Sequence, residues 1–152
     1  MLRNMLKSKI HRAYVTDADV HYEGSITLDP DLMDAALFIE FEQVHVWDVT
    51  NGQRIVTYVM EGERGLGTVA INGAAAHLIK KDDIIIIGSY AVYDETELTD
   101  HCMRRVYVDA ENRVKKVERS EYRTRNVSCH SERSEESQKK SPRFFVPAGH
   151  SE

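Results

Sequence analysis

The chain has 152 residues, 41% of them hydrophobic, which is enough for one packed domain with a tail. Its net charge is −5, and the acidic excess lies in residues 1–118, where 13 Lys and Arg stand against 20 Asp and Glu. This balance excludes a nucleic-acid surface, because phosphate binding requires concentrated cationic groups. No apolar run reaches the roughly 18 residues of a membrane span, and the N-terminus lacks a secretory core. We therefore expect a cytoplasmic protein without membrane or nucleic-acid partners.

The first predicted element is a strand over residues 6–15. Its alternate side chains would form two faces, one with Lys7, Lys9 and His11 and the other with Leu6, Ile10 and Tyr14. A second extended stretch over residues 20–28 passes through Gly24 and Ser25. A short helix over residues 30–38 follows, because Asp29 and Pro30 suit the N-cap and the first helical position.

Residues 43–50 and 53–60 are predicted to pair as a hairpin, because Asn51-Gly52 is a strong signal for a two-residue turn. The returning strand would point Arg54, Val56 and Tyr58 to one side. The remaining predicted elements are a short strand (68–71), an Ala-rich helical turn (73–79), a buried strand (84–93) and a hairpin (104–109 with 113–119). Many short strands with two small helices indicate a mostly-β domain, either a barrel or a sandwich.

The composition changes near the C-terminus to Ser, Glu, Arg and Lys, and residues 123–152 are predicted to be disordered. We therefore divide the chain into a domain over 1–119 and a tail over 120–152. Cys102 and Cys129 form no C-x-x-C pair and are interpreted as free thiols.

Two further patterns carry no site. The seven histidines lack the spacing of metal ligands, so no metal is predicted. Residues 65–70 fit G-x-G-x-x-A, but they lead into a predicted strand and lack the later acidic residue of a dinucleotide site.

Gly24-Ser25 can carry unusual chemistry. A serine hydroxyl can attack the preceding carbonyl carbon, and glycine leaves that carbonyl unshielded and tolerates strained angles. The resulting ester can eliminate to dehydroalanine, which hydrolyses to a pyruvoyl group, an electrophile that forms a Schiff base with an amine. Taken alone, Gly-Ser is an ordinary turn dipeptide.

Three separated motifs change this interpretation: His-Tyr-Glu-Gly-Ser at 21–25, Asn-Gly-Gln-Arg-Ile-Val-Thr-Tyr at 51–58, and Ile-Asn-Gly-Ala-Ala-Ala-His at 71–77. Together they resemble the pyruvoyl-dependent aspartate 1-decarboxylase family at matching spacing. The resemblance runs from residue 1 to about 93 and continues weakly to about 119.

The resemblance implies a six-stranded double-psi β-barrel with short helices, assembled as a homotetramer with active sites between subunits. It implies self-cleavage between Gly24 and Ser25 into residues 1–24 and 25–152, with Ser25 becoming the covalent pyruvoyl cofactor. The mature enzyme would convert L-aspartate to β-alanine and CO₂ for pantothenate biosynthesis. Whether a maturation factor assists the cleavage is left open.

The resemblance also assigns roles to single residues. Tyr58 would donate a proton, Thr57 would contact substrate and assist cleavage, and Asn72 would hydrogen-bond near the pyruvoyl group. Substrate carboxylates would be held by Lys9 and Arg54. Backbone contacts would come from Gly73, Ala74 and Ala75.

Each residue also has an ordinary interpretation. Lys9 and Arg54 could be surface side chains, Tyr58 a half-buried tyrosine, and Asn72-Gly73 a turn. His11 could assist cleavage or be a structural neighbour of the site. Two alternative functions stay open: an uncleaved barrel that acts as a binding or assembly module, and a pyruvoyl decarboxylase of another amino acid such as glutamate.

Two positions depart from the family pattern. Leu37-Phe38 stands where the family has a helix-ending glycine, so the helix should run on or end with strain. Asp82 replaces a turn glycine, and Asp tolerates left-handed angles better than most residues.

Overall fold

The computed structural model describes residues 1–122, so residues 123–152 of the predicted tail, with Cys129, lie outside the described residues. The first two residues of the predicted tail, 120 and 121, belong to the last strand of the domain. The strands are β1 (Leu2–Tyr14), β2 (Asp17–Asp19), β3 (Ser25–Leu28), β4 (Gln43–Asp48), β5 (Arg54–Glu61), β6 (Val69–Asn72), β7 (Ile84–Asp94), β8 (Cys102–Val108) and β9 (Val114–Glu121). The helical elements are α1 (Pro30–Ala36) and two 3₁₀ turns, η1 (Gly73–His77) and η2 (Leu98–Asp100). The predicted mostly-β class is confirmed.

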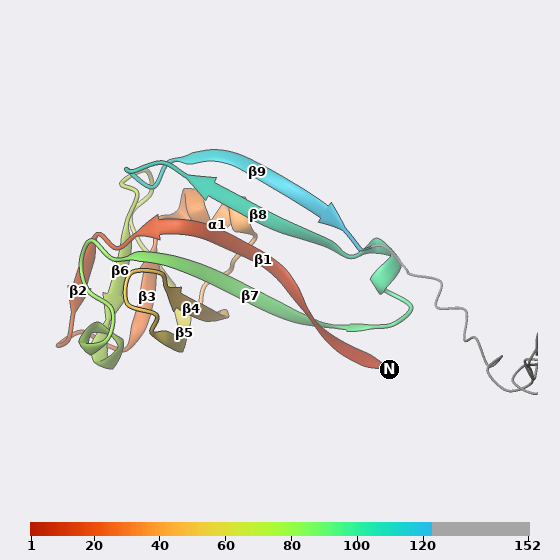
Figure 1. The fold of residues 1–152 in the computed structure, drawn as a ribbon, viewed down its shortest axis with the longest axis horizontal. Coiled ribbons are helices and arrows are strands. Elements are labelled where there is room, and N and C mark those ends of the chain that lie inside the picture. Colours follow the sequence, from red (N-terminus) through yellow and green to blue (C-terminus); the bar gives the residue numbers. More distant parts are fainter. Residues whose placement is uncertain (123–152) are drawn as a thin grey trace, which may run out of the picture.

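The strands form one continuous, strongly curved sheet in the order β2-β6-β3-β5-β4-β7-β1-β8-β9. Three pairs are parallel, β1 with β8, β2 with β6 and β3 with β5. The short strands gather at one end of the molecule, whereas β1, β7, β8 and β9 run on toward the N-terminus as a long arm (Figure 1). This barrel-like arrangement agrees with a double-psi barrel, and the number of strands in the barrel itself stays a prediction.

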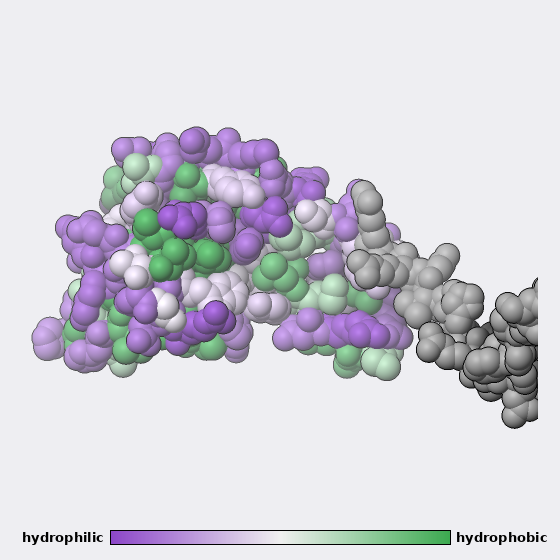
Figure 2. All heavy atoms as spheres, viewed as in Figure 1, coloured by the Kyte–Doolittle hydropathy of each residue, from purple (hydrophilic) through white to green (hydrophobic). Residues whose placement is uncertain are grey.

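The core lies on the inner face of this sheet. Helix α1 packs against β1, β8 and β9. The fully buried side chains are mostly branched aliphatic residues, including Ile10, Ile26, Val59, Ile71 and Ile87. Hydrophobic groups also reach the surface in patches between hydrophilic areas (Figure 2). Among residues 1–122, no helix is long and apolar enough to cross a membrane.

Strand β1 does not keep the predicted alternation. Its pairing with β7 shifts register between Leu6 and Ser8 and again between Ile10 and Ala13. Each bulge adds one residue to one face. The first turns Lys7 inward beside buried Ser8. The prediction that Lys7 shares a face with Lys9 and His11 is therefore wrong, and so is the shared face of Leu6, Ile10 and Tyr14.

The inward Lys7 is neutralised by Glu42. Its ammonium nitrogen lies 2.5 Å from a Glu42 carboxylate oxygen and 2.8 Å from the Leu37 carbonyl oxygen. Burial alone would raise the pKa of Glu42, but hydrogen bonds from Lys7, the Ser89 hydroxyl and the Ile39 amide lower it below its ordinary value. The half-buried charge is thus both paired and hydrogen-bonded, as an ion out of water requires.

Helix α1 starts as predicted. Asp29 is the N-cap, and its carboxylate accepts from the Asp31 amide at 2.8 Å and from the amides of Gly65 and Gly67. The helix ends two residues before the predicted limit, at Ala36, because Leu37 takes the left-handed conformation with φ 54°. That strained ending was one of the two expected outcomes.

Turn chemistry differs from prediction in two loops. Residues 20–24 form a turn and not a strand, because the Asp19 carboxylate accepts from the His21 amide at 2.8 Å. The loop after β4 is longer than a two-residue turn, because the Asp48 carboxylate binds the amides of Thr50 and Asn51. Asp82 takes φ 71°, so the expected left-handed turn is confirmed there.

Candidate active site

Ser25 is the first residue of β3 and is 1% exposed. It pairs with Asn72 of the antiparallel strand β6, and the Asn72 side-chain nitrogen donates to the Ser25 hydroxyl oxygen at 2.9 Å. The hydroxyl in turn donates over a long 3.4 Å contact to the Glu23 carbonyl oxygen. The nucleophile that the sequence predicts is therefore buried and held between two polar groups beside Gly24.

Gly24 lies directly against Gly73. Gly73 has φ 68°, and a Cβ atom on it would stand 2.7 Å from the Gly24 Cα and 2.9 Å from the Gly24 nitrogen. No side chain fits in that contact, so glycine at 73 is required both by backbone angle and by space. A Cβ on Gly24 would meet nothing within 4 Å, because its other side is open.

That open side faces a cavity of about 440 Å³. It is lined by the β5 segment from residue 55 to 58, by residues in and next to the turn η1, and by Gly24 and Asn72. The lining residues are Gly24, Ile55, Val56, Thr57, Tyr58, Asn72, Ala74, Ala75 and Leu78. Ligand pockets for small molecules have this order of size, roughly 300–1,000 Å³.

Eight of the ten predicted site residues thus meet in one place. Six of them line the cavity. The other two contact lining residues: Ser25 contacts Asn72, and Gly73 contacts Gly24. Ala74 and Ala75 have short side chains, so the backbone groups of η1 lie near the cavity. Tyr58 is 36% exposed, which leaves its hydroxyl group accessible.

Arg54 does not line the cavity. It stands one residue before the lining segment of β5 and pairs with Trp47 of β4. On β5, Arg54, Val56 and Tyr58 are exposed, whereas Ile55 and Thr57 between them are less exposed. This alternation confirms that Arg54, Val56 and Tyr58 point outward together. Arg54 therefore lies on the outer face of the sheet next to the cavity.

Lys9 is farther away. Across the sheet, Lys9 pairs with Gly88 of β7, which pairs with His45 of β4, which in turn pairs with Val56 of β5. Three strand spacings separate β1 from β5, which is roughly 14 Å. Lys9 and Arg54 share the outer face, but one chain does not bring Lys9 to the cavity.

His11 also lies outside the cavity lining. Its ring packs edge-on against Tyr107 with 5.5 Å between ring centroids. Burial lowers the pKa of His11, and the cationic groups of Lys9, Arg12 and Arg105 lower it further. The ring is consequently kept neutral, and its part in cleavage stays a prediction.

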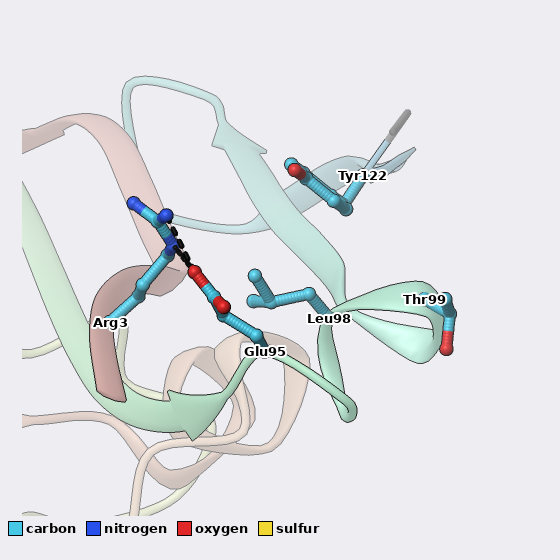
Figure 3. Close-up of a pocket in the computed structure, with 5 residues that line it drawn as sticks. All are labelled: Arg3, Glu95, Leu98, Thr99 and Tyr122. Atoms are coloured by element: carbon cyan, nitrogen blue, oxygen red, sulfur yellow. Dashed lines mark hydrogen bonds and ion pairs between the residues drawn. The ribbon is translucent and has the colours of Figure 1, made fainter. Parts of the chain in front are cut away.

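A second cavity, of about 280 Å³, lies in the long arm and contains none of the predicted residues. It is lined by Arg3, Glu95, Leu98, Thr99 and Tyr122 (Figure 3). The Arg3 guanidinium donates two hydrogen bonds to Glu95, at 3.0 and 2.6 Å. Arg3 is thus already paired, so this cavity does not offer a free cation to an acidic ligand. No cluster of three metal-ligating side chains occurs among the described residues.

Two features near the main cavity escaped the sequence analysis. Thr27 binds the same Asn72 amide as Ser25, at 2.9 Å. At the end of β4, Asp48 is 3% exposed, and the carboxyl group of Asp83 is close enough to raise its pKa. The Asn51 side chain donates to the Leu78 carbonyl oxygen at 2.9 Å, so the loop after Asp48 joins the β5 wall to the η1 wall. Period-two spacing from Ser25 would have indicated Thr27; no local pattern indicates the acid pair.

The acid pair should make stability depend on pH. Burial raises the pKa of Asp48 and the Asp83 carboxyl raises it further, against the lowering effect of the Asn51 and Thr50 amides. Between the ordinary pKa of an aspartate and the raised pKa of Asp48, the folded state holds a proton that the unfolded state has released. The free energy of unfolding therefore falls as pH rises through this range. Asp48→Asn should raise the free energy of unfolding at neutral pH by about 1 kcal/mol, the size of one buried hydrogen bond.

Urea unfolding of the Asp48→Asn protein, at equal chain concentration and in an uncleaved Ser25→Ala background, measures this effect. The gain should vanish at acidic pH, where Asp48 is protonated in both states. Asp82→Asn removes an adjacent charge at an exposed position and should change neither value. A loss of stability at neutral pH in Asp48→Asn would contradict the repulsion.

A comparison with protein families gives a match to the family described as aspartate decarboxylase, over residues 1–115. The match includes the Gly24-Ser25 bond, both cavity walls and the outer face that carries Lys9 and Arg54. It covers about three quarters of the sequence. The chain therefore belongs to the aspartate decarboxylase family.

Proposed function

We propose that this chain cleaves itself between Gly24 and Ser25 and that the mature protein decarboxylates L-aspartate to β-alanine and CO₂, a step toward pantothenate. Family membership supports the reaction class. One observation carries the rest of the proposal. The Ser25 hydroxyl is buried, held by Asn72 at 2.9 Å, and adjoins a glycine that opens into a cavity of amino-acid size.

Self-cleavage needs only groups of this chain and one water molecule. The Ser25 oxygen adds to the Gly24 carbonyl carbon, the C–N bond breaks, and the proton passes to the Ser25 nitrogen, which leaves an ester. Loss of the Ser25 α proton to a solvent base then breaks the Cβ–O bond, and Gly24 departs as a carboxylate. The remaining dehydroalanine takes up a proton at its methylene carbon to become an imine, and water then releases its nitrogen as ammonia and leaves a ketone.

That ketone is the pyruvoyl group, which supplies an electrophile for the substrate amine and a sink for the electron pair that CO₂ leaves behind. The site fits it, because Ser25 adjoins two residues that line the cavity, Gly24 and Asn72, and the Asn72 amide donates to its oxygen. Asn72 would hold it, Ala74 and Ala75 would present backbone groups to substrate, and Thr57 would face both substrate and the cleavage site.

The substrate carboxylates need cations. Arg54 lies beside the cavity and can grip a carboxylate with two parallel hydrogen bonds. Lys9 is roughly 14 Å from β5 within one chain, so we propose that a neighbouring subunit of a homotetramer supplies it. The sheet face that carries both residues is exposed and includes Val56 at 56% and Val92 at 63%, which suits a contact between subunits.

Tyr58 is the proposed proton donor to the carbon that loses CO₂. Tyr58→Phe should lower kcat by about 100-fold with little change in KM, because general acid catalysis contributes 10²–10⁴-fold. Steady-state kinetics on fully cleaved protein tests this. Tyr14→Phe, with 38% exposure against 36% for Tyr58, is the matched control and should leave kcat unchanged. An unaltered kcat in Tyr58→Phe would assign the proton to another group.

The reaction itself is tested by incubating purified protein separately with L-aspartate and with L-glutamate and quantifying the amine products. We expect β-alanine from aspartate and little 4-aminobutyrate from glutamate. A reversed preference would overturn the substrate assignment but keep the chemistry. Absence of both products from fully cleaved protein would overturn the decarboxylase proposal.

A further inference from the structure

The side-chain amide of Asn72 is divided between two hydroxyl groups of β3. Ser25 and Thr27 stand two residues apart on a strand, so their side chains share one face. The Asn72 nitrogen donates to the Ser25 oxygen and to the Thr27 oxygen at 2.9 Å each. Asn72 is 5% exposed, so water does not readily replace either acceptor. Both hydrogens of one amide are thus committed to this face.

We propose that Thr27 is a positioning residue for self-cleavage: its hydroxyl holds the Asn72 amide so that the second N–H points at the Ser25 oxygen. This inference rests on the proposed self-cleavage and goes beyond it, because Thr27 does not touch the bond that breaks. Without the Thr27 acceptor, one buried N–H would lack a partner. A buried donor without an acceptor is unfavourable, which favours rotation of the amide away from Ser25.

The orientation of Thr27 is itself enforced. A Cβ atom on Gly62 would stand 3.0 Å from the Thr27 methyl group, so glycine at this position leaves room for that methyl. The Gly62 amide also donates to the Leu28 carbonyl oxygen at 2.9 Å, which ties the two chain segments together. With its methyl packed at Gly62, Thr27 turns its hydroxyl toward Asn72.

The chemistry of each step shows where the N–H donor acts. In the first step the Ser25 oxygen gives up electron density to the Gly24 carbonyl carbon, so a donor on that oxygen brings no advantage. In the second step a solvent base takes the Ser25 α proton, the Cβ–O bond breaks, and its electron pair stays on the oxygen, which becomes part of the Gly24 carboxylate. Negative charge grows on this oxygen, and a fixed N–H donor stabilises it. Thr27 should therefore assist elimination and not ester formation.

Thr27→Val tests this, because valine keeps the shape and the methyl group and removes only the hydroxyl. We expect the conversion of intact chain into residues 1–24 and 25–152 to slow by about 10-fold, the equivalent of one lost hydrogen bond. The ester should accumulate, and hydroxylamine should release it as a 25–152 chain that still begins with serine. Thr27→Ser keeps the hydroxyl and should cleave within about 3-fold of the unaltered chain.

A double mutant separates positioning from general damage to the fold. If Thr27 acts through Asn72, Thr27→Val should add no further slowing in an Asn72→Ala background, whereas independent effects multiply. An unaltered chain that cleaves, beside a Thr27→Val chain that cleaves equally fast without ester, would overturn the Thr27 proposal alone. An unaltered chain that never cleaves would overturn the proposed function instead. If Thr27→Val does not fold, Gly62→Ala replaces it as the test. The added methyl group presses on the Thr27 methyl and should turn the Thr27 hydroxyl away, so Gly62→Ala should cleave more slowly than Thr27→Ser. Equal cleavage rates in these two variants would likewise overturn the Thr27 proposal.

Discussion

Replacing Ser25 by alanine should leave the chain in one piece and abolish β-alanine formation. Alanine has no oxygen to attack the Gly24 carbonyl carbon, so neither the ester nor the ketone can form. The fold should survive, because the site is 1% exposed and accepts the smaller side chain, with Asn72 still bonded to Thr27. Loss of one hydrogen bond should cost about 1 kcal/mol of unfolding free energy.

Gel electrophoresis under denaturing conditions, together with an assay for β-alanine, measures both consequences. Ser25→Cys is the informative control, because a thiol at the same position keeps a nucleophile and should still allow hydroxylamine to break the chain. Aspartate turnover by uncut Ser25→Ala protein would show that the chemistry lies elsewhere in the site.

Replacing Gly73 by alanine should slow self-cleavage by about 100-fold or more. The added methyl group would stand 2.7 Å from the Gly24 Cα and 3.1 Å from the Tyr22 carbonyl oxygen, and both are backbone atoms that cannot turn aside. The Gly24-Ser25 bond must therefore shift, and a displacement of about 1 Å at a reacting centre can cost 10²-fold in rate. The alanine also pays about 1–2 kcal/mol for the left-handed angle of φ 68°.

Gly52→Ala separates these two causes. Gly52 has φ 80°, but a Cβ atom there would meet nothing within 4 Å. It should lose comparable stability and keep the normal cleavage rate, as followed by the mass of the chain over time. Equal slowing in both variants would assign the effect to backbone strain and not to contact with Gly24.

The candidate site could be predicted from the sequence to the extent that it follows from short-range spacing. Alternation along β5 placed Arg54 and Tyr58 on one side. That Gly24, Asn72 and Ala74 belong to one site was implied by the resemblance of the three motifs to the family, and the structure brings these residues to one cavity. Asp29 was identifiable as an N-cap because that role depends on residues within one turn. Such features are local, so local chemistry determines them.

The predictions from the sequence were wrong, or missing, where pairing between distant strands determines the position of a side chain. A period of two cannot reveal an extra residue, so the bulge that turns Lys7 inward toward Glu42 was invisible until β1 was paired with β7. The acid pair of Asp48 and Asp83 joins segments far apart in sequence. The separation of Lys9 from the cavity depends on the order of four strands.

Intact mass spectrometry of the purified chain, before and after borohydride treatment with L-aspartate, probes the central claim most directly. We expect two species, residues 1–24 and residues 25–152, with the second lighter by one ammonia molecule than a chain that begins with serine. Only the second species should gain mass as a reduced adduct, of aspartate or of its decarboxylated product β-alanine. A single uncut 152-residue chain that takes up no aspartate would contradict the account and would favour an uncleaved barrel that binds a partner instead.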